Sequence, residues 1–132
     1  MPKKTACPSS VKIGIQEYQI IQHNIKGDPL LTEGNYGYTQ DARNIIVIDV
    51  DLHDSKKKVT VFHEIMHAAR FIFENEKPKK TADFDELEHH FIALWENSLL
   101  MVLRDNPELT EWLLGEWTQT ESTRTLDKPR HY

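Results

Sequence analysis

The sequence contains one cysteine among 132 residues. Cys7 therefore has no partner for an intramolecular disulfide, and a single thiol excludes a zinc site built from several thiolates. No apolar run approaches the roughly 18 residues that a transmembrane helix needs, so no membrane span is predicted. The first residues, MPKKTACP, carry two lysines without an apolar stretch behind them. This start predicts no secretion signal and favours a cytoplasmic protein.

Positive charge is also scarce. The formal net charge is -5, and the largest basic cluster is Lys56-Lys57-Lys58. Such a surface argues against nucleic acid or anionic lipid as a partner. A hydrophobic content of 39% is ordinary for a soluble protein, and the length suits one domain. We expect that domain over residues 1–117 and a polar, flexible tail over residues 118–132.

The first half of the chain has the pattern of strands and turns. Alternating apolar and polar residues from residue 11 predict a half-buried strand, and Tyr18, Ile20 and Ile21 could extend it to residue 21 or begin a helix. Residues 26–37 are rich in turn-forming residues and predict a loop. Residues 36–39 and 44–52 predict two further strands. The latter, NIIVIDVDL, has the strongest strand pattern in the sequence because it is dense in β-branched residues.

The second half predicts three helices. Asp54 and Ser55 can cap a helix over residues 56–76. A polar connector containing proline separates it from a second helix over residues 84–103, and a short third helix is predicted over residues 108–117.

The segment VFHEIMHAAR, residues 61–70, places His63 and His67 one turn apart on the first predicted helix. At about 100° per residue their imidazoles project within about 40° of each other, so both can reach one ion. Glu64 lies about 100° around the helix from His63. At this angle its carboxylate is poorly placed to bind the ion directly but well placed to hold a water molecule bound to the ion. Imidazoles that hold Zn²⁺ and a carboxylate that accepts a proton from water are the requirements of metal-assisted hydrolysis. The pattern therefore predicts a hydrolytic metal site.

A catalytic zinc normally takes three protein ligands. Glu88 on the second predicted helix is the candidate for the third, since a carboxylate on a core-facing stripe needs a compensating cation. Glu86 points about 160° away from that stripe and Glu96 lies about 80° off it. His89 and His90 are expected at the surface, although either could approach the cleft from a helix edge. A partly exposed Glu88 is the alternative. The apolar members of the stripe are Phe84, Phe91, Ile92, Trp95, Leu99 and Val102.

These features resemble the zincin metallopeptidases of the gluzincin pattern, whose third ligand is a glutamate on the next helix. More closely they resemble the small ImmA/IrrE-type metallopeptidases of bacteria and phages. The matching stretches are GYTQDARNIIVIDVDL, VTVFHEIMHAARF and ELEHHFIALWENSLLMVLRDNPEL, within residues 36–114. The resemblance implies an α+β, minimal zincin-like fold in which a small twisted β-sheet of about three strands packs on the HExxH helix and a third-ligand helix follows. It implies Zn²⁺ held by His63, His67 and Glu88, with Glu64 as general base.

The implied function is that of a zinc-dependent metallopeptidase, an endopeptidase acting on a protein or peptide substrate in the cytoplasm, or in the host cytoplasm if a phage encodes it. An edge strand from residues 36–39 or 44–52 would align the peptide by backbone pairing. Tyr36, Tyr38 and His53 are candidates for stabilising the oxyanion. One alternative is a non-catalytic zinc-containing protein-binding module with the same fold. Another is a metal-free helical protein with histidines in its core.

Overall fold

The fold is α+β, and its sheet has four strands where about three were expected. The computed structural model describes residues 5–116, so the expected tail over residues 118–132 lies outside the described part. The strand order is β1-β2-β4-β3, with β2 and β4 parallel and the other pairs antiparallel. β3 is therefore an edge strand. The strands are β1 (Ser10–Ile13), β2 (Gln16–His23), β3 (Gly37–Gln40) and β4 (Ile45–Asp49).

The single strand predicted over residues 11–21 is instead a hairpin. Gly14 has a φ of +63°, a left-handed conformation that glycine adopts at little cost, and the chain reverses there. Ile13 pairs with Gln16 across the turn. Ile15, which the alternation placed on the buried face, is at the turn and is 98% exposed. The prediction was wrong because it continued the alternation through a glycine that ends the strand.

The segment predicted as a loop over residues 26–37 contains two short helical turns. These are a 3-10 turn at Ile25–Gly27 and helix α1 at Pro29–Thr32. Asp28 caps α1, because its side chain accepts hydrogen bonds from the first backbone N–H groups of that helix. Leu31 on α1 is fully buried, and α1 contacts β3.

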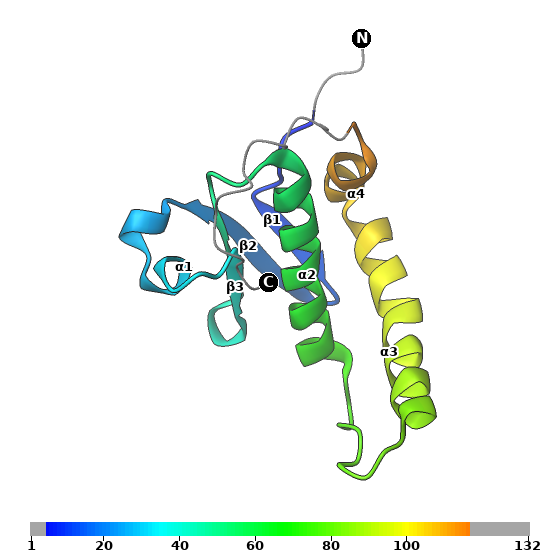
Figure 1. Cartoon of the computed structure of the whole chain (residues 1–132). Helices are drawn as coiled ribbons and strands as arrows, with labels where there is room; N and C mark the ends of the chain where they lie inside the picture. Colours follow the sequence, from blue (N-terminus) through cyan, green and yellow to red (C-terminus); the bar gives the residue numbers. More distant parts are fainter. Residues whose placement is uncertain (1–4, 117–132) are drawn as a thin grey trace.

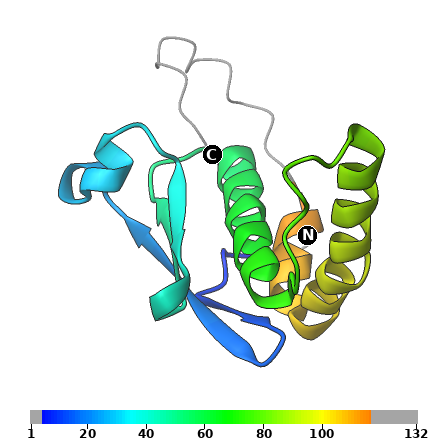
Figure 2. The ribbon, with the colours of Figure 1, turned by 90° about the horizontal axis from the view of Figure 1, so that it is seen from below.

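Three helices follow β4, close to the predicted ranges. They are α2 (Asp54–Phe73), α3 (Phe84–Asp105) and α4 (Pro107–Leu114). Figures 1 and 2 both show α2 between the sheet and α3, so α2 is covered on two sides. No helix within the described residues is long and apolar enough to cross a membrane.

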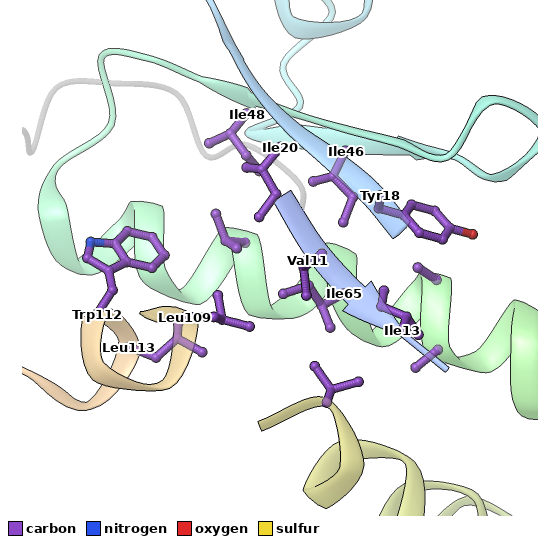
Figure 3. Packing of buried hydrophobic residues seen from close by; sticks show 14 of the residues in the cluster. Val11, Ile13, Tyr18, Ile20, Ile46, Ile48, Ile65, Leu109, Trp112 and Leu113 are labelled. Atoms are coloured by element: carbon purple, nitrogen blue, oxygen red, sulfur yellow. The ribbon is translucent and has the colours of Figure 1, made fainter. Parts of the chain in front are cut away.

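The hydrophobic core lies between the sheet, α2 and α4, as Figure 3 shows. Ile46 and Ile48, two residues apart on β4, are fully buried on the face that meets α2. Val61 and Ile65, four residues apart on α2, are fully buried opposite them. Further core residues are Val11, Ile13, Tyr18, Ile20, Leu52, Ala68, Ala69, Val102, Leu109, Trp112 and Leu113.

Gly37 allows strand β3 to lie close to α2. A Cβ atom at this position would be 2.7 Å from the carbonyl oxygen of Val47 and 3.1 Å from Cγ2 of Thr60. The first of these atoms belongs to the backbone and cannot turn aside. The absence of a side chain at residue 37 therefore helps to set the spacing between the edge strand and the helix with the histidines.

Gly37→Ala is expected to lower the free energy of unfolding by about 1 to 3 kcal/mol, because the added methyl group overpacks this contact. Gly27→Ala is the matched control, since a Cβ there would meet nothing within 4 Å. We expect the control to change stability by less than about 0.5 kcal/mol. Urea denaturation of both variants measures the difference, and equal losses would contradict the role given to Gly37.

Candidate functional site

His63 and His67 lie one turn apart on α2, and their rings converge. Their Nε2 atoms are 3.0 Å apart, and the ring planes meet at 75°. Two nitrogens bound to one tetrahedral zinc at about 2.0 to 2.1 Å would be about 3.3 to 3.4 Å apart. A small adjustment of either ring therefore fits the pair to one ion, while in the metal-free protein the same spacing suits a hydrogen bond between the rings.

The surroundings of His63 favour its neutral form. Burial lowers the pKa of His63, the positive charge of His67 acts in the same direction, and the negative charge of Glu64 opposes both. The net effect is a lowered pKa. Metal binding requires an unprotonated imidazole, so His63 is in the right form to be a ligand near neutral pH.

Glu64 is buried and faces the edge strand. Glu64 is 3% exposed, and its Oε1 accepts a hydrogen bond of 2.8 Å from Oγ1 of Thr39 on β3. Glu64 and His67 together line a pocket of about 320 Å³ between β3 and α2. Thr39 is not among the candidate residues that the sequence predicts. The only feature of the sequence that points to it is the edge strand predicted near the cleft. The other lining residues are Asn35, Gly37, Tyr38, Thr39 and Asp41.

Glu88 does not join the histidine pair. It is exposed, so the expected buried position of this carboxylate is wrong, although Val102 of the same stripe is buried and Trp95 packs against the core. Phe84 and Ile92, assigned to the same stripe, are 76% and 53% exposed. Within residues 5–116, no group of three His, Cys, Asp or Glu side chains is placed to hold one metal ion. The structure thus assembles two of the three expected ligands.

The orientation of α3 explains this difference. Ser98 and Val102 are its buried residues, and His90, expected at the surface, faces α2 with its Nε2 2.6 Å from Oε2 of Glu74. Residue 88 lies about 200° around the helix from residue 90, so Glu88 is not on the side of α3 that contacts Glu74 through His90. His89 is exposed, and its Nδ1 lies 2.9 Å from a backbone carbonyl of its own helix.

Glu74 joins the end of α2 to the start of α3. Its side chain is 7% exposed, and its two oxygens lie 3.1 and 3.2 Å from Nε of Arg70. The Arg70 guanidinium lies 5.1 Å from the ring centre of Phe91 on α3. Burial by itself would raise the pKa of Glu74, but the hydrogen bonds from His90 and Arg70 outweigh it and lower the pKa. Ionised Glu74 therefore stabilises the packing of the two helices.

The stabilisation by Glu74 is expected to depend on pH. Because the pKa of Glu74 is lower in the folded than in the unfolded chain, its contribution is present above the ordinary value of 4.5 and is lost as the pH falls through the folded value. At pH 7, Glu74→Gln is expected to lower the free energy of unfolding by about 1 to 3 kcal/mol relative to wild type. The difference should shrink toward pH 3, as urea denaturation at several pH values will show.

Glu76→Gln is the control for this measurement, because Glu76 is exposed just beyond the end of α2. Its stability should follow that of wild type across the pH range. A loss in Glu74→Gln that is the same at pH 7 and pH 3 would contradict the role given to the ionised carboxylate.

Of the three oxyanion candidates, Tyr38 lines the pocket. Its hydroxyl donates a 2.6 Å hydrogen bond to Oδ2 of Asp28, and burial together with this bond raises the pKa of Tyr38 to about 12. The hydroxyl proton is therefore directed to Asp28 and not to the pocket. Lys56 lies 5.4 Å from the ring centre of Tyr36, and His53 precedes α2 without a side-chain capping bond. For Tyr36 and His53, a catalytic role stays a prediction.

Comparisons with protein-family models, curated proteins and solved structures found no match. The fold and the site define an α+β protein in which one helix presents a convergent histidine pair, with a buried carboxylate and a pocket beside an edge strand.

Proposed function

We propose that the protein is a zinc-dependent peptidase that cleaves peptide bonds within protein substrates, with Glu64 as general base. The observation that supports this most strongly is the convergence of His63 and His67, whose Nε2 atoms are 3.0 Å apart. The carboxylate of the intervening Glu64 lines the pocket that His67 also lines. Nitrogen ligands next to a proton acceptor are the two components that metal-assisted hydrolysis needs.

His63 and His67 would hold the zinc, and their geometry fits this ion. Bound zinc would polarise the substrate carbonyl and make water more acidic. Oε1 of Glu64 is occupied by Thr39, so Oε2 is the atom that would accept a proton from a water molecule in the pocket. The same carboxyl group would then return the proton to the leaving amine.

Strand β3 would align the substrate. The backbone N–H of Asp49 donates to the carbonyl of Tyr36 over 2.9 Å, so residues 36, 38 and 40 direct their backbone groups toward β4. The alternation turns the N–H and C=O groups of Gly37 and Thr39 away from β4. They face the edge of the sheet that has no strand partner among the described residues, and Thr39 is the more exposed of the two. An extended peptide could add to the sheet there, beside the pocket that contains Glu64. This arrangement favours a protein or peptide substrate.

A non-catalytic zinc-containing protein-binding module with the same fold is the second candidate. It is favoured by the ligand set, since the described residues bring two protein ligands together and a catalytic zinc usually has three. It is also favoured by the exposed apolar side chains of Phe84 and Ile92 on α3. In such a module Glu64 would have no chemical task.

The test of the proposed function combines metal analysis with substrate profiling of the purified chain. We expect about one zinc per chain and cleavage of an unbiased peptide library by wild type but not by Glu64→Gln. Zinc far below one per chain, not restored by added zinc, would contradict both candidates. Bound zinc without any cleavage would contradict the peptidase and favour the binding module.

A further inference from the structure

Thr39 connects the edge strand to the general base of the proposed peptidase. Its Oγ1 lies 2.8 Å from Oε1 of Glu64 and 3.2 Å from the backbone oxygen of the same residue. Thr39 is opposite Ile46 in the β3–β4 ladder, and Ile46 is fully buried against α2. Because directly opposed residues share one face of a sheet, the register directs the Thr39 side chain toward α2.

The hydroxyl of Thr39 limits the orientations that Glu64 can take. A glutamate side chain has three rotatable bonds, and the Glu64 residue is 97% buried. Among the described residues, Thr39 is the hydrogen-bond donor to its carboxylate. A charged acceptor makes this bond stronger than one between neutral groups. The bond holds Oε1 against β3, and the Glu64 side chain lines the pocket beside it.

We infer that Thr39 is a positioning residue that sets the carboxylate of Glu64 for proton transfer, an inference that rests on the proposed peptidase function. The backbone of Thr39 also faces the open edge of β3, where the substrate peptide would pair. One residue thus links the two partners of the reaction, because its backbone would align the peptide while its side chain orients the base. The distance between the scissile bond and Glu64 would then depend on the position of Thr39 in the strand.

The experiment compares Thr39→Val, Thr39→Ser and Thr60→Val in the full-length, zinc-loaded protein. Valine keeps the shape of threonine and removes its hydroxyl. Thr60 is the control because it lies on α2 against β3, fully buried where Thr39 is partly buried, and its Oγ1 donates to the carbonyl of Lys56 within its own helix, at 2.7 Å. Steady-state hydrolysis of a library-derived peptide gives kcat and KM, and elemental analysis gives the zinc content.

We expect Thr39→Val to lower kcat by about 10- to 100-fold with little change in KM or zinc content. Thr39→Ser should recover most of the loss, and Thr60→Val should stay within about twofold of wild type, since its hydroxyl contacts no group of the site. An unchanged kcat in Thr39→Val would overturn the inference. So would an equal loss in Thr60→Val, which would indicate a general effect on the packing of β3.

A second measurement needs no activity. In the zinc-free protein, the carboxyl ¹³C resonance of Glu64, assigned by its loss in Glu64→Gln, should shift in Thr39→Val and not in Thr60→Val. An unshifted resonance would overturn the inference even in an active enzyme. If wild type cleaves no peptide, the peptidase proposal fails and Thr39 has no reaction to serve, whereas the resonance still decides whether Thr39 orients the carboxylate.

Discussion

Glu64→Gln is expected to lower kcat for peptide hydrolysis by about 10²- to 10⁴-fold while zinc content and stability stay close to wild type. The amide has the shape of the carboxylate but cannot accept a proton. Its carbonyl oxygen can still accept the hydrogen bond that Thr39 donates to Glu64 in the structure. The variant therefore removes the base without removing the contact between β3 and α2.

The measurement is kcat on the best peptide from the library, with zinc content and thermal unfolding determined on the same samples. Glu86→Gln makes the same chemical change at an exposed position on α3 and should behave as wild type. Equal hydrolysis by wild type and Glu64→Gln would contradict the proposed peptidase function. The zinc-containing binding module would then be the favoured candidate.

His67→Ala and His63→Ala are each expected to weaken zinc binding by more than about 100-fold, since even the loss of a residue behind a ligand costs about 10- to 100-fold. The loss follows from the geometry, because each variant removes one of two nitrogens that lie 3.0 Å apart. A single remaining imidazole on a helix surface makes a weak site. Competition with a chromophoric zinc chelator measures the affinity.

Glu88→Ala is the informative companion to the histidine variants. The resemblance to gluzincins implies that Glu88 is the third ligand, whereas the structure leaves this residue exposed on α3. From the structure we expect zinc affinity within about twofold of wild type. A loss comparable to that of His67→Ala would show that α3 turns when zinc binds, and the orientation set by His90 and Glu74 would then belong to the metal-free protein alone.

The sequence by itself determined the features that depend on neighbours along the chain. The α2 helix and its histidine pair follow from a spacing of four residues, because one turn of helix brings such side chains together wherever the helix lies. Strand β4 is local in the same sense, because its β-branched residues favour a strand wherever it lies. The hairpin at Gly14 was also local, but its signal is a single glycine, and the alternating pattern around it concealed the turn.

Only the tertiary structure decided which residues from other elements reach the histidines. Helical periodicity gives the relative directions of residues on α3 but not which of them other elements cover, and the partly buried contact between His90 and Glu74 lies on another side of α3 from Glu88. The contact between Thr39 and Glu64 joins residues 25 positions apart. It depends on the strand register and on the close approach at Gly37, since packing between distant segments sets both.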